Sequence, residues 1–190
     1  MTNMYFENIT YEKINYTLFP LPKGEYDNCK FINCNFASSD LSRIVFEECT
    51  FTNCDLSVVN VTQSSLKDIS FIESKLLGIT FEQCNKFLFS LTFNSCDLTL
   101  SSFYKCPMSN TRFTNCTLQE VNFSETELTN SAFDKCDLLD AHFERTMLEK
   151  ADFSTAYNYS INPEINKIKK AKFSIPGIVG LLDSYDITIT

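Results

Sequence analysis

The chain lacks the features by which most enzymes are recognised. Its 190 residues contain no tryptophan, one histidine and only four glycines. The four glycines form no phosphate-binding loop of the Walker or Rossmann kind. The single histidine, His142, has no nucleophile placed beside it by the sequence pattern. We therefore expect no enzymatic activity, no catalytic residues and no cofactor.

Long hydrophobic runs are also missing. No stretch of 18 apolar residues is present, so the sequence predicts no membrane-spanning helix. The first residues, Met1 to Tyr5, do not combine a basic region with an apolar run, so no signal peptide is expected. We therefore expect a cytoplasmic protein without a membrane contact. The formal net charge of −8 disfavours direct binding of nucleic acid and favours a basic partner.

What the chain does have is a strict period of five residues. A large apolar residue recurs every five positions from Phe31 to Phe81 and again from Phe93 to Phe153. This period fits neither an α-helix, with 3.6 residues per turn, nor an ordinary strand, in which side chains alternate. It predicts a chain that turns after every five residues and directs one large side chain inward each time.

A second inward position lies two residues before each large one and holds mainly small residues. All nine cysteines of the chain occupy this position. We interpret them as small buried hydrophobic residues, which is the usual role of free cysteine, and this usage suits a reducing cytoplasm. The alternative is a zinc site made by Cys29, Cys34, Cys49 and Cys54, which form two C-x₄-C pairs. Five further cysteines share the same position without such pairing, so core packing is preferred and no metal is expected.

Three repeats share an acidic residue followed by a large apolar residue, namely Cys54-Asp55-Leu56-Ser57, Cys96-Asp97-Leu98-Thr99 and Ala151-Asp152-Phe153-Ser154. They resemble the A(D/N)LXX motif of the pentapeptide-repeat family, within which the chain is similar to the Qnr, MfpA and McbG group. The resemblance implies an all-β, right-handed quadrilateral β-helix in which four five-residue sides make one coil of 20 residues. It also implies that a short C-terminal helix and strand module forms a homodimer.

The period divides the chain into three parts. Residues 1–25 are expected to form an irregular N-terminal coil or cap, and residues 26–155 the β-helix, with a break at 82–92 where two extra residues interrupt the repeat. Residues 156–190 are expected to form a helical and strand module. A helix is expected to begin at Asn162 and Pro163, a second after Ser174, and a strand over 186–190. This tail could fold back as a cap, but a dimer is preferred, with an interface formed by Ile178, Val179, Leu181, Leu182, Ile187 and Ile189.

Acidic residues are concentrated near the end of the repeat. The 20-residue coil places Glu120 beside Asp140, which are like charges, and Glu125 beside Arg145, which are opposite charges. We expect an acidic, partner-binding face that consists of Glu120, Glu125, Glu127, Asp134, Asp137, Asp140, Glu144 and Glu149.

The family resemblance implies a role for this acidity. Members of the Qnr, MfpA and McbG group resemble duplex DNA in width and charge and act on type II topoisomerases, which relieves poisoning of DNA gyrase. The same role is the leading hypothesis for this chain, with DNA gyrase or topoisomerase IV as the partner. The alternatives are a scaffold that binds an unrelated cytoplasmic protein, and a largely passive fold.

Overall fold

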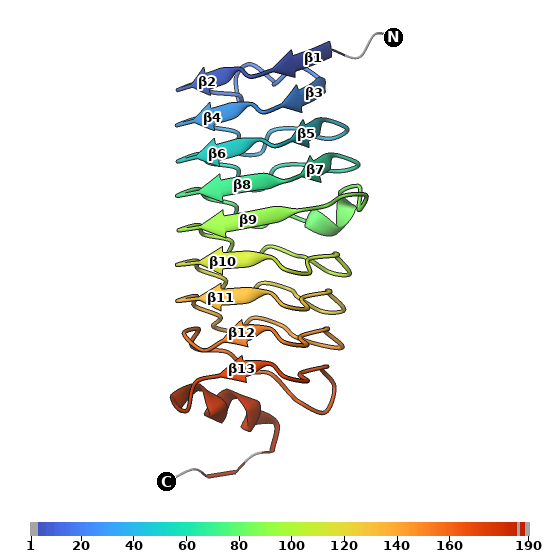
Figure 1. Ribbon diagram of the computed structural model, residues 1–190. Coiled ribbons are helices and arrows are strands. Elements are labelled where there is room, and N and C mark those ends of the chain that lie inside the picture. Colours follow the sequence, from blue (N-terminus) through green and yellow to red (C-terminus); the bar gives the residue numbers. More distant parts are fainter. Residues whose placement is uncertain (1–3, 186, 189–190) are drawn as a thin grey trace.

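The computed structural model describes residues 4–185, 187 and 188, which form a rod of stacked coils (Figure 1). Each strand is only two to four residues long, because the chain turns at every corner. The strands are β1 (Met4–Glu7), β2 (Thr10–Glu12), β3 (Gly24–Asp27), β4 (Lys30–Ile32), β5 (Val45–Glu47), β6 (Thr50–Thr52), β7 (Ser65–Lys67), β8 (Ile69–Ile72), β9 (Leu91–Asn94), β10 (Arg112–Thr114), β11 (Ala132–Asp134), β12 (Asp152–Phe153) and β13 (Lys172–Phe173).

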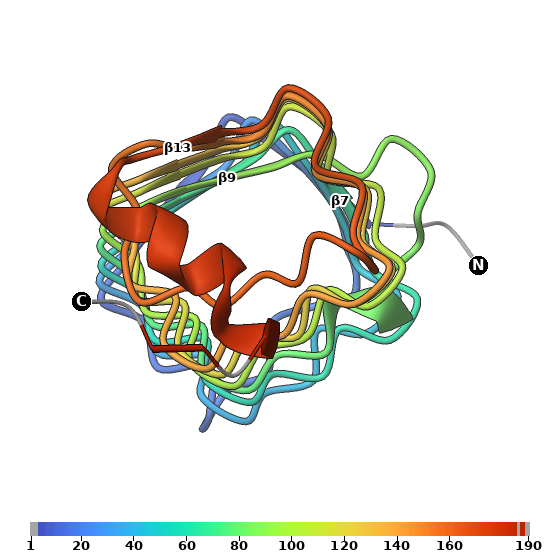
Figure 2. The same cartoon turned by 90° about the horizontal axis from the view of Figure 1, so that it is seen from below.

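These strands form parallel sheets along two sides of the rod. Side 1 contains the four-stranded sheet β1-β3-β5-β7, and side 2 contains the nine-stranded sheet β13-β12-β11-β10-β9-β8-β6-β4-β2. The other two sides are held by isolated parallel bridges. On side 3 these run from Asn15↔Asn35 to Asp137↔Tyr157, and on side 4 they include Asp40↔Asn60 and Asn122↔His142. Seen along its axis, the rod has a four-sided outline (Figure 2).

The strand register confirms the 20-residue coil and the β-helix. Phe31 pairs with Phe51, and Phe113 pairs with Phe133, each partner lying 20 residues further along the chain. Across the break the step is 22, because Phe71 pairs with Phe93. The predicted insertion of two residues is therefore confirmed.

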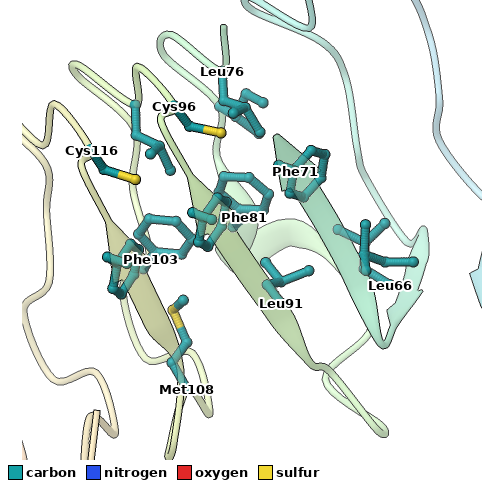
Figure 3. Packing of buried hydrophobic residues seen from close by; sticks show 14 of the residues in the cluster. Leu66, Phe71, Leu76, Phe81, Leu91, Cys96, Phe103, Met108 and Cys116 are labelled. Carbon is teal, nitrogen blue, oxygen red and sulfur yellow. The ribbon is translucent and has the colours of Figure 1, made fainter. Parts of the chain in front are cut away.

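The interior is filled by columns of side chains from equivalent positions of successive coils. On side 2 the aromatic rings stack, with centroids 5.0 Å apart between Phe93 and Phe113 and 4.6 Å apart between Phe133 and Phe153. Such contacts add about 0.5–1.5 kcal/mol per pair to the gain from burial. All nine cysteines are free and buried, as predicted. Cys96 and Cys116 lie on neighbouring coils beside this packing (Figure 3).

Corners are made by residues with a left-handed backbone. The residue two after each large inward position has a φ near +50 to +65°, for example 50° at Asn53 and 53° at Lys135. Its N–H still donates to the neighbouring coil, as from Asn115 to the carbonyl of Asp134 at 2.8 Å. Asparagine tolerates this backbone well, which explains its frequency at corners.

The insertion forms a loop on side 1, beside β7. Regular pairing ends at the bridge Ser65↔Asn85 and resumes where the N–H of Ser90 donates to the carbonyl of Leu66 at 3.1 Å. Between these points Phe87 is 69% and Leu88 60% exposed, whereas Phe89 is buried. The Lys86 ammonium group donates to the carbonyl of Lys105 at 2.8 Å and thereby ties the loop to the next coil.

The N-terminal coil is more regular than predicted. β1 pairs with β3 and β2 with β4 in the same 20-residue register. Only the segment before β3 is irregular, and it contains Pro20 and Pro22. Gly24 is required where this segment rejoins the coil, because a Cβ at Gly24 would lie 2.5 Å from the carbonyl oxygen of Met4.

The C-terminal end differs from the prediction in three ways. The coils do not stop after Phe153, because β13 pairs with β12 and Met147 forms a bridge with Lys167. No helix begins at Asn162, whose side chain instead accepts a hydrogen bond from the N–H of Glu164 at 2.9 Å. Ile187 and Thr188 are not in a strand, and the other residues of the expected strand, 186, 189 and 190, lie outside the described part.

The second expected helix is present as short 3-10 turns, η2 (Pro176–Leu181) and η3 (Asp183–Tyr185). The Ser174 hydroxyl accepts a hydrogen bond from the N–H of Gly177 at 3.0 Å, at the start of η2 as predicted. These turns lie across the end of the rod (Figure 2). Among the residues that the structure describes, no helix has the length and apolar character needed to cross a membrane.

Candidate partner-binding surface

The eight carboxylates expected on an acidic face are distributed over all four sides of the rod. The strand and bridge register assigns each of them to a side. Glu127 and Glu149 are on side 1, Asp134 on side 2, Glu120, Asp137 and Asp140 on side 3, and Glu125 and Glu144 on side 4. The structure therefore does not bring them together on one face.

Glu120 and Asp140 lie beside each other, as the 20-residue spacing predicts. The N–H of Glu120 donates to the carbonyl of Leu139 at 2.9 Å, which fixes the two corners on neighbouring coils. Both side chains are exposed, and neither has an ion pair or hydrogen bond with another described residue. Neighbouring like charges disfavour folding slightly, so this pair is not explained by stability.

Glu125 is held in a network instead. Its carboxylate lies 3.3 Å from the Lys105 ammonium group and 3.3 Å from the Arg145 guanidinium group, so the predicted pair with Arg145 is confirmed. The Tyr104 hydroxyl also donates to it at 3.2 Å. Desolvation raises the pKa of Glu125, but hydrogen bonds from Lys105 and Tyr104 outweigh it and leave this pKa below its usual value. The charge of Glu125 is therefore largely neutralised.

Three other carboxylates have partners within the rod. Asp134 accepts a hydrogen bond from the Thr155 hydroxyl at 2.8 Å, and Glu144 lies 3.4 Å from the Arg145 guanidinium group. Asp137 accepts from the amides of Gln119 and Asn158, each at 2.8 Å. Of the eight predicted carboxylates, Glu120, Glu127, Asp140 and Glu149 have no such partner in the described part.

A further acidic surface, on the N-terminal half of side 1, was not predicted. The opposite charge there is Lys67, 3.1 Å from Glu47. The Tyr5 hydroxyl donates to Asp27 at 2.7 Å, and this hydrogen bond raises the pKa of Tyr5 to about 12. The signal was present in the sequence as acidic residues spaced by 20 positions. The residues of this surface are Glu7, Glu25, Asp27, Glu47, Glu48 and Asp68.

The expected dimer-interface residues divide into two groups. Ile178 is 51% and Val179 45% exposed, whereas Leu181 and Leu182 are partly buried. Ile187 is exposed, and Ile189 lies outside the described residues. Ile175, which was not predicted, is the most exposed of the apolar residues here, at 89%. Apolar side chains therefore face solvent beside η2.

The one histidine of the chain and the metal-ligating side chains were the remaining candidates for a reactive site. His142 is exposed on side 4. No three or more His, Cys, Asp or Glu side chains of the described residues are placed so that they could hold a metal ion.

Comparisons with known proteins agree with this geometry. Two segments, residues 25–86 and 74–153, match the family described as "Pentapeptide repeat region". A search of curated proteins finds no match.

Similar solved structures include two forms of QnrB1, described as a plasmid-mediated fluoroquinolone resistance protein. A trypsin-treated variant has 16% sequence identity and a TM-score of 0.56, covering 98% of this chain and 92% of that chain. The full-length form has 16% identity and a TM-score of 0.43, covering 97% and 100% of the two chains. HetL, from the cyanobacterium Nostoc sp. strain PCC 7120, has 11% identity and a TM-score of 0.42, covering 91% and 87%. Because the family match spans most of the coils, the chain belongs to the pentapeptide-repeat family.

Proposed function

We propose that this protein is a non-catalytic, acidic rod that binds a type II topoisomerase, DNA gyrase or topoisomerase IV, in place of DNA and protects it against a poison. The observation that carries the proposal is the distribution of carboxylates over all four sides of a straight rod. Duplex DNA likewise presents negative charge around its whole circumference. The fold is also that of QnrB1, whose description names fluoroquinolone resistance.

The amount of charge limits how this mimicry works. Nine coils at about 4.8 Å each span roughly 43 Å. Duplex DNA of that length carries about 25 negative charges, whereas the chain carries a net charge of −8. Binding must therefore depend on the shape of the rod and on local groups rather than on total charge. Glu120 and Asp140 are the best candidates, because they occupy the same corner on neighbouring coils and their carboxylates have no partner among the described residues.

The C-terminal end supports a homodimer as part of this proposal. Ile175, Ile178 and Val179 are exposed beside η2, at the end of the rod. Joining two rods at this end would double the length of the DNA-like body and place Glu120 and Asp140 of both chains near its centre.

The test is a gyrase supercoiling assay with and without a quinolone. The native protein is expected to inhibit supercoiling or to restore it in the presence of the drug. The variant Glu120→Lys/Asp140→Lys is expected to need about tenfold more protein, since the loss of a close charge pair costs at least about 1.5 kcal/mol. A matched control is Glu7→Lys/Glu48→Lys, which changes the net charge equally at the far end of the rod.

The control variant is expected to act like the native protein. Equal loss in both variants would show that only total charge matters. If the native protein had no effect on supercoiling, with or without the drug, gyrase would be excluded as the partner. This outcome would favour a scaffold for another protein, bound through a side of the rod.

A further inference from the structure

The corner between sides 3 and 4 carries two exposed apolar side chains, which lie two coils apart. Val58 is 62% and Leu100 60% exposed, and both occupy the corner itself. Leu77, which is partly buried, and Gly78 lie on the coil between them. The apolar–acidic stripe is defined as this group together with the next two corner residues, namely Val58, Leu77, Gly78, Leu100, Glu120 and Asp140.

Two apolar residues of the stripe have a backbone that is unfavourable for them. Val58 has a φ of 56° and Leu100 a φ of 62°. Bulky and β-branched residues are disfavoured in this region, which costs roughly 1–2 kcal/mol. Other described residues with positive φ are mainly polar, and the remaining apolar one is Leu88 in the loop. Stability of the fold therefore does not explain why Val58 and Leu100 are apolar.

Hydrogen bonds fix the order of the stripe along the rod. The N–H of Val58 donates to the carbonyl of Leu77 at 2.8 Å, and the N–H of Gly78 donates to Thr99 at 3.0 Å. The N–H of Leu100 then donates to the carbonyl of Gln119 at 3.0 Å, just before Glu120. Gly78 places no side chain between Val58 and Leu100. A methyl group at Gly78 would contact Val58 Cγ2 at 3.8 Å.

The same corner changes character after Leu100. The next two residues in this position are Glu120 and Asp140, whose carboxylates have no partner in the described part. The stripe is thus apolar over three coils and acidic over the next two.

We propose that the apolar–acidic stripe binds one face of an α-helix of a partner protein. This face carries apolar residues at one end of the helix and Lys or Arg at the other end. The spacing favours a helix over a strand. Successive coils are about 4.8 Å apart, and successive turns of a helix about 5.4 Å. Same-face residues of a strand are about 6.6 Å apart and would soon lose register. From Val58 to Asp140 the stripe spans roughly 19 Å, which matches about 13 helical residues.

This inference goes beyond the proposed function, because it does not require the partner to be a topoisomerase. It shares Glu120 and Asp140 with that proposal, so its test must not use gyrase. The probe is a fluorescein-labelled synthetic peptide of about 15 residues. It carries leucine at helical spacing in one half and lysine in the other, and a scrambled peptide of equal composition serves as the reference.

Fluorescence anisotropy would measure peptide binding to four proteins. The native protein is expected to bind the amphipathic peptide and not the scrambled one. Val58→Asn/Leu100→Asn is expected to bind about tenfold or more weakly, since two apolar contacts are lost. Glu120→Lys/Asp140→Lys is expected to bind more weakly as well. Leu88→Asn makes the same chemical change at a positive φ in the loop of side 1 and is expected to leave binding unchanged.

Misfolding would not produce this pattern. Asparagine is better suited than valine or leucine to a positive φ, so Val58→Asn/Leu100→Asn is expected to raise the thermal midpoint by about 2–4 °C for each kcal/mol of strain relieved. Weaker binding by a more stable protein would support the stripe. Binding no better than that of the scrambled peptide would overturn the proposal. Unchanged binding by Val58→Asn/Leu100→Asn, or equal loss in Leu88→Asn, would do the same. If the peptide binds as expected but the protein has no effect on gyrase, the proposal for the stripe is kept and only the topoisomerase is rejected as the partner.

Discussion

At the scale of single residues, the inward cysteines act as small core residues with a weak hydrogen bond. The Cys49 thiol donates to the carbonyls of Tyr26 and Glu47, each at 3.3 Å. Burial raises the pKa of Cys49, Cys54 and Cys84 to about 12. These thiols therefore stay neutral in the folded rod at pH values where the unfolded chain ionises.

This difference predicts a loss of stability in alkaline solution. Above the ordinary thiol pKa, 9.0, the unfolded chain releases protons that the folded chain keeps until about pH 12. The free energy of unfolding is therefore expected to be insensitive to pH near neutrality. Above pH 9 it should fall, by up to about 1.4 kcal/mol per pH unit for each such thiol. Urea unfolding between pH 7 and 10 would measure this.

The control for this experiment is Cys49→Ala/Cys54→Ala, which should lose less stability between pH 9 and 10 than the native protein. An equal loss in both proteins would assign the effect to other groups. Fast labelling of the folded protein by a thiol reagent at neutral pH would contradict burial of the thiols.

At the scale of elements, the break shows how a repeat absorbs an insertion. The ladder is complete on both sides of it, and only the turn between Lys86 and Phe89 projects. Phe89 is buried, so it takes the interior place that Lys86 would occupy in an unbroken repeat. The insertion therefore costs little regular pairing.

Removal of the insertion is expected to restore an ordinary coil. Deletion of Lys86 and Phe87 leaves the sequence Cys84-Asn85-Leu88-Phe89-Ser90, in which Leu88 takes the large inward position. We expect an unchanged β-type circular dichroism spectrum. The thermal midpoint should lie within about 4 °C of the native value, which corresponds to about 1 kcal/mol.

The matched control is deletion of Asn122 and Phe123 in the uninterrupted repeat. It moves polar residues to inward positions and is expected to cause severe loss of stability. If the deletion at 86–87 were as damaging, the loop would be a structural requirement of the rod.

At the scale of the whole molecule, the two ends of the rod are unlike. Residues of η2 lie against the last coil, where the N–H of Ile161 donates to the carbonyl of Gly180 at 2.8 Å. The outer surface beside η2 nevertheless exposes Ile175, Ile178 and Val179. Part of the tail thus covers the end of the core, while the rest remains available for a second chain.

The dimer can be tested by light scattering coupled to size-exclusion chromatography. The native protein is expected to have twice the mass of one chain. Ile178→Asp/Val179→Asp is expected to have the mass of a single chain, because burial of two carboxylates in an apolar interface is costly. Phe87→Asp/Leu88→Asp replaces two exposed apolar residues elsewhere and should remain dimeric. A monomeric native protein would reject this interface.

The sequence by itself determined the repeat, the inward positions, the burial of the cysteines and the neighbours 20 residues apart, because each depends on a local period that the chain repeats. It also contained a signal for one more coil, because Ile168 and Phe173 keep the five-residue phase and Ile161 lies at a second inward position. The structure buries Ile161 there. Asn166 obscures that signal, because a polar amide is not expected at an inward position. In the structure its amide accepts a hydrogen bond from the N–H of Thr146 and donates one to the carbonyl of Phe143. Only the tertiary structure decided which carboxylates are paired, on which side each one lies and how the tail covers the core. These features depend on side chains from different coils that meet in space, and a linear period does not specify them.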